Sequence, residues 1–404
     1  MNETGRSKQQ NFTLILILGA LNTITPFSID MYLPAFPRIA ADFHTGIDQV
    51  ALSVSTYFLG YAIGQILYGP LLDRFGRKPP LYTGLVIYII ATIGCFTTST
   101  IEGLWIMRFI QAIGGCVASV AAMAMVRDFF PVKQSAAVTS LLVLILGASP
   151  LLAPTAGSFI ITAWGWHTVF IVLAAITFII LLLAFFFLPE GHVADKTISL
   201  KPIPILKGFR TVLTTPRFYV FALAGTFSFS GLFVYVANSP AIFMNHFHLG
   251  EKIYGGVFAL LSVGFIGGSQ LNHILTKRFS NQQIFTTALL VQVLLALVFL
   301  VGSANAWYGL ASVIVLLFIL LCCCGITYPN AAALCMAPFA KNAGTASALL
   351  GFIQIGIGGL ISASVGILHM DAITAMALVM AATVLVALAI LLPAKKLLAA
   401  NTFA

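Results

Sequence analysis

The sequence predicts an all-α membrane protein with about twelve transmembrane helices. Of its 404 residues, 60% are hydrophobic and only 8% are charged, whereas roughly a quarter of the residues in soluble domains are charged. Apolar segments of about 20 residues, the length that crosses a hydrocarbon core of roughly 30 Å, recur along the whole chain. Because backbone polar groups must be paired within lipid, segments of this length must be helices rather than short alternating β-strands.

The first span is expected to remain in the protein. Arg6 and Lys8 precede it, but no small-residue cleavage pattern follows it, and Pro26 and Asp30 lie within it, unlike the apolar core of a cleaved signal peptide. In order, the expected spans are 12–32, 49–71, 80–98, 103–126, 136–160, 167–188, 217–238, 253–275, 284–302, 306–330, 343–367 and 373–392.

The positive charges occupy alternate loops. Of the 20 lysines and arginines, only Arg38 and Lys252 fall on one side of this topology, and Arg108 falls within a span. The other side carries Arg6, Lys8, Arg74, Arg77, Lys78, Arg127, Lys133, Lys196, Lys201, Lys207, Arg210, Arg217, Lys277, Arg278, Lys341, Lys395 and Lys396. Since cytoplasmic loops are enriched in lysine and arginine, an even number of spans and two cytoplasmic termini follow. This topology accounts for the net charge of +9 without a nucleic-acid partner.

The longest polar stretch between spans divides them six and six. Residues 189–216 are rich in charge and proline, so we expect an N-terminal half, 1–188, a cytoplasmic linker, 189–216, and a C-terminal half, 217–404. A faint repeat supports duplication, because the loops after the second and eighth spans share the pair Arg-Phe at 74–75 and 278–279. Two six-helix halves with a substrate site between them near the bilayer midplane are one way in which transporters are built.

A short charged loop follows the second span. Residues 69–78 read GPLLDRFGRK, and as a plain cytoplasmic turn they would only contribute to the charge asymmetry. In spacing and position, however, they resemble the signature loop of the major facilitator superfamily. The resemblance implies a latch in which Asp73 contacts the start of the eleventh span, the arginines bond nearby loops and the glycines allow close approach. The implied gating residues are Gly69, Asp73, Arg74, Gly76, Arg77 and Arg127.

The fourth and fifth spans carry two further motifs. Residues 104–115, LWIMRFIQAIGG, resemble the superfamily motif in which an intramembrane arginine serves proton transfer, with Ala112 replacing a usual glycine. In the fifth span, glycines and prolines at i, i+3, i+7 and i+10 share one helix face. That face resembles the antiporter motif in a variant form, although small residues also simply let helices pack closely. Its members are Gly147, Pro150, Pro154 and Gly157.

Four more segments narrow the resemblance: residues 28–34 (SIDMYLP), 126–128 (VRD), 148–154 (ASPLLAP) and 343–351 (AGTASALLG). Together they are similar to the Bcr/CflA subfamily of bacterial drug/proton antiporters, the bicyclomycin and chloramphenicol resistance type, over essentially the whole chain. The resemblance implies a major facilitator fold with two pseudo-symmetric halves in the bacterial inner membrane. It also implies efflux of small drug-like compounds in exchange for protons. We expect a monomer surrounded by lipid.

Asp30 and Arg108 are the charges left inside the membrane, where such residues are costly and usually functional. Both lie roughly 5 to 8 Å inside the outer boundary by helical rise, so they share a depth and would meet if the first and fourth spans are neighbours. Burial favours a protonated carboxyl group and a nearby arginine favours the charged form, so small rearrangements would load or release a proton. The alternatives are that Asp30 lies among the headgroups and that Arg108 only bonds helix carbonyls.

Several polar stripes are candidates for the substrate pocket, although aromatic stripes at helical spacing often belong to the core. The candidates in the first half are Asn22, Tyr57, Tyr61, Gln65, Gln111 and Gly115. The second half offers the uncharged side chains of Asn238, Asn330 and Gln354. This difference predicts that proton coupling resides in the first half.

Other chemistry is not expected. The six cysteines lack zinc-ligand spacing and read as small packing residues, and His246 and His248 have no third ligand beside them, so neither a metal nor a cofactor is predicted. The expected spans contain no cluster of histidine and carboxylate side chains, so the sequence does not indicate an enzyme. The absence of a G-x-x-x-x-G-K-[ST] loop fits a secondary transporter.

Three functions remain open because one fold serves several. The leading one is a proton-coupled multidrug antiporter that works by alternating access. The second is a facilitator or proton symporter that imports a small metabolite. The third is a membrane subunit driven by a separate ATPase.

Overall fold

The computed structural model describes residues 8–191, 194–195, 209–339, 343–368 and 370–400 of the chain. Twelve of its helices are long and apolar enough to cross a membrane, and no β-strand occurs in these ranges. The predicted all-α fold with twelve spans is confirmed.

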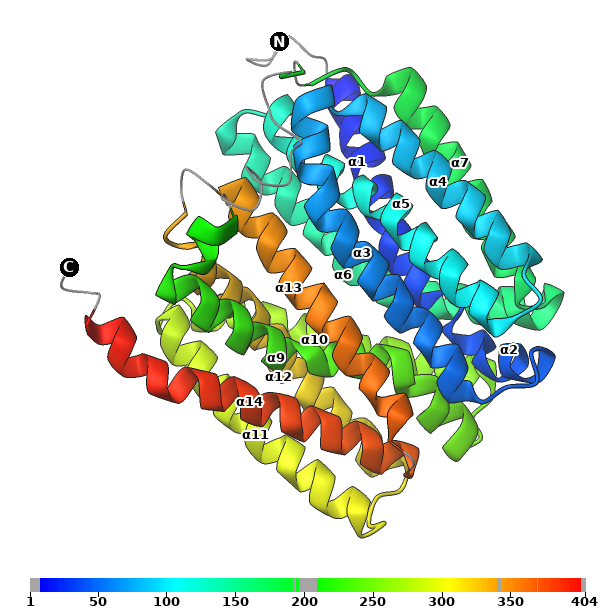
Figure 1. The fold of residues 1–404 in the computed structure, drawn as a ribbon, viewed down its shortest axis with the longest axis vertical. Coiled ribbons are helices and arrows are strands. Elements are labelled where there is room, and N and C mark those ends of the chain that lie inside the picture. The colour runs from blue at the N-terminus through cyan, green and yellow to red at the C-terminus, as the bar shows by residue number, and fades with distance from the viewer. Residues whose placement is uncertain (1–7, 192–193, 196–208, 340–342, 369, 401–404) are drawn as a thin grey trace.

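The first six spans lie in one bundle, drawn from blue to green in Figure 1. Their helices are α1 (Lys8–Asp30), α2 (Phe36–Asp42), α3 (Ile47–Phe75), α4 (Lys78–Thr97), α5 (Ile101–Phe129), α6 (Val132–Trp164) and α7 (His167–Phe187). A short 3₁₀ turn, Leu33–Ala35, joins α1 to α2.

The other six spans lie beside them, drawn from green to red in Figure 1. Their helices are α9 (Pro216–Pro240), α10 (Glu251–Leu275), α11 (Asn281–Ala304), α12 (Leu310–Met336), α13 (Ala343–Ser364) and α14 (Ala372–Ala400). A π-helical turn, Ala241–His246, extends α9, and a 3₁₀ turn, Val365–Ile367, follows α13. Residues 196–208 of the expected linker lie outside the described residues.

Local chemistry explains several helix ends. Ser280 begins α11 with a capping box, because its side chain accepts from the Gln283 backbone N–H and the Gln283 side chain accepts from Ser280. Gly76 ends α3 at a φ of 84°, a conformation that favours glycine. The tenth span begins at Leu310, later than the expected 306, because Ala306 takes a φ of 55° and turns the chain.

Helix α2 was not expected from the sequence. The first span was predicted to end near residue 32, but a second short helix carries the chain on to Asp42. Pro37 occupies the first turn of this helix, where the missing N–H of proline costs nothing.

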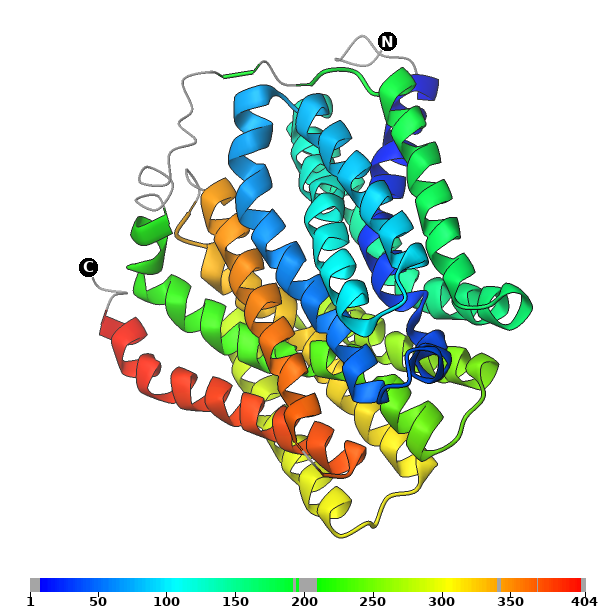
Figure 2. The ribbon, with the colours of Figure 1, turned by 45° about the vertical axis from the view of Figure 1, so that its right-hand side comes forward.

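The two bundles meet along α3 with α13 and along α6 with α10. Phe58 of α3 and Phe233 of α9 lie with ring centroids 4.8 Å apart, and both belong to one hydrophobic cluster that continues from bundle to bundle. Figure 2 shows the bundles closest at the end that carries α2 and spread apart at the end that carries the termini. At the spread end, open space lies beside Gly69 of α3 and Gly344 of α13.

Candidate functional site

Arg108 of α5 is completely buried, and two aromatic rings enclose its guanidinium group. The carbon at the centre of that group lies 4.4 Å from the ring centroid of Tyr32 and 4.3 Å from that of Tyr57. A cation over the face of an aromatic ring is attracted by the ring quadrupole, and the attraction grows when water is excluded. The rings of α3 and of the segment after α1 therefore hold a charge that the bundle would otherwise disfavour.

Polar contacts continue from one edge of this guanidinium into the first half. Arg108 Nη1 donates to Gln111 Oε1 at 2.6 Å, and Gln111 Nε2 donates to Thr92 Oγ1 of α4 at 2.7 Å. Arg108 Nε and Nη2 have no hydrogen-bond partner among the described residues. Arg108 thus keeps the N–H groups of two nitrogen atoms available for a carboxylate or another acceptor.

Asp30, the last residue of α1, lies at the junction of the two bundles. Its exposed fraction is 5%, and it is the only acidic side chain among the buried polar residues of the described chain. The turn Leu33–Ala35, which begins three residues after Asp30, contacts α9 and α10 of the second bundle. The Tyr235 hydroxyl of α9 has no hydrogen-bond partner within the described residues. The end of α1 therefore lies against the second bundle.

The expected contact between Asp30 and Arg108 is not made in this structure. No ion pair joins them within the part of the chain that is described. Tyr32, which lies in the turn after α1, contacts Arg108 instead. Equal depth in the membrane therefore does not determine which residue of this segment meets Arg108.

The other first-half candidates divide between packing roles and the bundle junction. Asn22 Nδ2 donates to the Leu142 carbonyl of α6 at 3.1 Å, and Tyr61 bonds Ser119 through their hydroxyls at 2.5 Å. Gly115 packs against the Tyr88 ring, which a Cβ would approach to 2.9 Å. Gln65 faces α13, where a Cβ on Gly351 would lie 3.2 Å from its Oε1. Of these four, Gln65 is the one that packs against the second bundle among the described residues.

The second-half candidates are buried. Asn238 Nδ2 donates to the carbonyls of Val234 at 3.0 Å and Ser362 at 3.4 Å, which ties α9 to α13. Asn330 Nδ2 donates to Asn272 Oδ1 at 2.6 Å and so ties α12 to α10. Gln354 is buried on α13.

A buried network in the second half was missed from the sequence. Ser228 Oγ donates to Gln292 Oε1 at 2.7 Å and contacts Thr327 Oγ1 at 3.0 Å. These residues belong to α9, α11 and α12, and single polar residues inside apolar spans are the sequence signal that could have found them.

The glycine and proline face of α6 lies where α1, α6 and α10 meet. A Cβ on Gly157 would lie 1.8 Å from the Met31 carbonyl oxygen, so that position excludes a larger residue. A Cβ on Gly255 of α10 would lie 3.4 Å from the Pro154 carbonyl oxygen, whereas Gly147 has only Ile266 nearby, at 3.9 Å. Pro150 and Pro154 both lie inside the helix. This face contacts the second bundle and the residue that follows Asp30.

The charged loop after α3 is built around Arg77. Its Nε donates to Asp128 Oδ2 at 2.7 Å, its Nη1 to Asp73 Oδ1 at 2.8 Å and its backbone N–H to Glu190 Oε1 at 3.0 Å. Partial burial alone would lower the pKa of Arg77, but the hydrogen bonds that it donates to Asp128 and Asp73 raise its pKa above the ordinary value. The loop thereby fastens α3, α5 and the segment after α7 together.

The remaining gating residues surround this loop. Gly76 supplies its left-handed turn, while the expected close approach at Gly69 is not made here, because nothing lies within 4 Å of a Cβ built there. Arg74 lies over the Phe75 ring at 5.8 Å, and Arg127 is exposed near the end of α5. Asp73 and Asp128 both lie in motifs that the sequence shows, but the sequence does not reveal that they share Arg77 as a partner.

No group of three or more histidine, cysteine, aspartate or glutamate side chains that could hold a metal ion occurs within the residues that the structure describes.

Comparisons with known proteins give a consistent result. The model of the family described as Major Facilitator Superfamily matches residues 18–363. The chain is 27% identical over 379 residues to a "Bicyclomycin resistance protein homolog" of Haemophilus influenzae, covering 94% of this chain and 95% of that protein. It is 30% identical over 338 residues to "Multidrug resistance protein MdtL" of Escherichia fergusonii, covering 83% and 84% of the two chains.

The fold matches solved transporters as well. A crystal structure of a D-xylose-proton symporter superposes with a TM-score of 0.73 at 15% sequence identity, covering 93% of this chain and 97% of the other. At that identity the likeness concerns the fold alone.

Proposed function

Because this chain belongs to the Major Facilitator Superfamily, we propose that it exports small amphipathic compounds across a bacterial inner membrane in exchange for protons. It is a multi-pass membrane transporter and not an enzyme. The relatives named for bicyclomycin resistance and multidrug resistance support drug-like substrates. The proton exchange and its direction are the parts that need experiment.

One observation carries the proton role. Asp30 is the only acid among the buried polar residues described, and no cation within the described ranges forms an ion pair with it. The turn that follows it contacts the second bundle. A carboxylate held away from water without a partner of opposite charge is unfavourable, so in this state we assign Asp30 a bound proton. A cationic substrate is the other partner that would satisfy it.

Arg108 provides the second part of the cycle. Its Nε and Nη2 atoms have donors to spare, and its ring partner Tyr32 lies two residues from Asp30. We propose that a shift of the α1 end brings the Asp30 carboxylate to Arg108 in another state. Pairing with the guanidinium favours the charged carboxylate, so the proton is released there.

The two states correspond to alternating access between the halves 1–188 and 217–404. The positive loops support a cytoplasmic position for the termini and the linker, so the end that carries α2 faces outward. With that orientation, the bundles are in contact on the outer side and apart on the inner side. The Asp73–Arg77 loop and the start of α13 are then placed to meet when the inner side closes.

Transport by purified protein in proteoliposomes tests this function. A fluorescent lipophilic cation and a proton gradient are supplied, and both fluxes are followed. We expect outward dye movement, relative to the cell, to be accompanied by inward proton flow, with both lost in Asp30→Asn. The matched control is Asp48→Asn, at an acid on the outer turn of α3.

Two results would count against the proposal. Unchanged coupling in Asp30→Asn would remove its proton role. Gradient-driven uptake of a metabolite, in place of dye export, would make the protein a symporter.

A further inference from the structure

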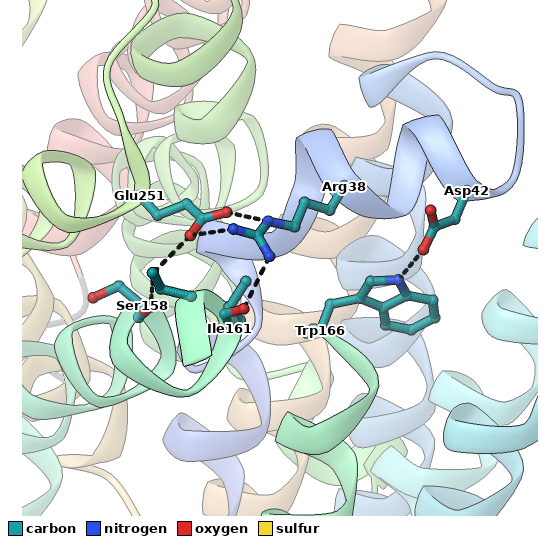
Figure 3. A network of polar contacts seen from close by, with 7 residues as sticks. Arg38, Asp42, Ser158, Ile161, Trp166 and Glu251 are labelled. Carbon is teal, nitrogen blue, oxygen red and sulfur yellow. Dashed lines mark hydrogen bonds and ion pairs between the residues drawn. The ribbon is translucent and has the colours of Figure 1, made fainter. Parts of the chain in front are cut away.

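Arg38 of α2 and Glu251, the first residue of α10, form an ion pair between the two bundles (Figure 3). Arg38 Nε lies 2.5 Å from Glu251 Oε1, and Arg38 Nη2 donates to Glu251 Oε2 at 3.1 Å. Two parallel bonds from one guanidinium to one carboxylate fix the orientation of both groups. The pair joins residues that are 213 positions apart in the sequence.

Helix α6 contributes to the same contact. Arg38 Nη1 donates to the Ile161 carbonyl at 3.0 Å, and Thr162 Oγ1 donates to Glu251 Oε2 at 2.9 Å. The Glu251 side chain is only 16% exposed, and the N-terminus of α10 favours its negative charge. The Arg38 side chain is 44% exposed, but the pair has further bonds to α6 that an isolated surface pair lacks.

A surface cleft lies beside the ion pair. The cleft has a volume of about 560 Å³ and includes Pro37, Thr162, Met244 and Glu251 in its lining, but not Asp30. Gly157 of α6 packs against Met31, the residue that follows Asp30, and Ile161 and Thr162, about one turn further along α6, contact the ion pair. The same stretch of α6 thus runs from the end of α1 to the Arg38–Glu251 pair.

We propose that the Arg38–Glu251 ion pair is the outer gate of this transporter. Separating the pair frees the first turn of α10 from α2 and α6 and opens the seam above Asp30 to the outer solution. Re-forming it closes that seam while the inner ends of the bundles are apart. The assignment of this gate to the outer side rests on the proposed function. The ion pair between the two bundles is independent of that orientation.

Access to Ser158 measures the state of this gate. Ser158 is 1% exposed and lies one turn before Thr162 on α6, and its carbonyl oxygen, 2.7 Å from Thr162 Oγ1, shares the single hydroxyl hydrogen of Thr162 with Glu251. In a variant whose six cysteines are replaced, Ser158→Cys is labelled with a membrane-impermeant maleimide in right-side-out membrane vesicles. The initial labelling rate is compared at matched protein amounts.

We expect Glu251→Gln and Arg38→Gln each to raise the labelling rate at least about tenfold, since hydrogen bonds to charged groups are lost. The double variant Arg38→Glu, Glu251→Arg should label more slowly than either single variant, because the charges again attract. The matched control is Asp42→Asn, whose carboxylate accepts from Trp166 Nε1 at 2.6 Å within the first bundle (Figure 3). It should leave the rate unchanged.

Equal labelling rates in the wild type and in both single variants would overturn the gate. A rise in the labelling rate of Asp42→Asn as large as that of the single variants would also overturn it. The measurement uses neither a drug nor a proton gradient. A positive labelling result together with intact coupling in Asp30→Asn would leave the gate standing and remove only the proton role proposed above.

Discussion

The guanidinium carbon of Arg108 lies 4.3 Å from the ring centroid of Tyr57, whose hydroxyl has no hydrogen-bond partner in the described chain. The ring, and not the hydroxyl, is therefore the part of Tyr57 that holds the buried charge.

This geometry separates two substitutions at one position. Tyr57→Phe keeps the ring and should melt close to wild type in detergent. Tyr57→Leu removes the ring and should lose about 2 kcal/mol of stability, the size of a desolvated cation–π contact. The unfolding midpoints of both variants, measured by thermal denaturation, check this order; equal losses would show that the hydroxyl matters.

Two glycines on α6 should respond differently to the same substitution. A Cβ at Gly157 would lie 1.8 Å from the Met31 carbonyl oxygen, whereas one at Gly147 finds its nearest atom at 3.9 Å. Gly157→Ala should therefore force the end of α1 away from α6 and reduce both thermal stability and transport. Gly147→Ala is the matched control and should change neither in this conformation; the same assay on both variants decides.

The carboxylates around Arg77 should differ in their contribution to stability. The Asp73 side chain is 52% exposed and makes one contact, while that of Asp128 is 14% exposed and makes two. Asp73→Ala should cost about 1 kcal/mol or less, as exposed pairs do. Asp128→Ala should cost about 1.5–3 kcal/mol, typical of a charged hydrogen bond in a less exposed position. Thermal or denaturant unfolding of the two variants tests the order, and the reverse order would contradict it.

A disulfide across the bundle junction should stop the transport cycle. Ser55 of α3 and Ser362 of α13 bond through their hydroxyls at 2.7 Å, so cysteines at both positions lie close enough to pair. In a variant without the native cysteines, oxidation should abolish transport and a reductant should restore it.

A protease site inserted in the linker reports this bond directly. After cleavage, the two halves should migrate together on a non-reducing gel only when the disulfide has formed. Full transport by the cross-linked protein would show that α3 and α13 do not separate at this point.

The spans were predictable because length and hydropathy alone determine whether a helix can cross a membrane. The order of the helices along the chain was predictable for the same reason. The helix ends differ from those expected where local geometry turns the chain, as at Ala306 with its positive φ. Helix α2 was missed because it continues the first span without a polar break that the charge pattern could mark. Both differences arise from local backbone geometry, which the hydropathy of a span does not encode.

The site was only partly predictable. Arg108 stands out as the charge within the fourth span, but its two aromatic partners come from two other segments, and depth does not say which way a side chain points. Tyr32, two residues after Asp30, makes the contact with Arg108 that was expected for Asp30. Arg38 and Glu251 read as ordinary loop charges, since one sequence carries no information on pairs formed between distant segments.

The aromatic enclosure of Arg108 also has a consequence for biogenesis. Tyr32 and Tyr57 precede Arg108 in the chain, so ribosomal synthesis delivers both rings to the membrane before the helix that carries the arginine. Insertion of a lone arginine near the centre of a helix costs roughly 2.5–3.5 kcal/mol by translocon measurements. The order of synthesis ensures that the groups that offset this cost are already in the bilayer when α5 arrives.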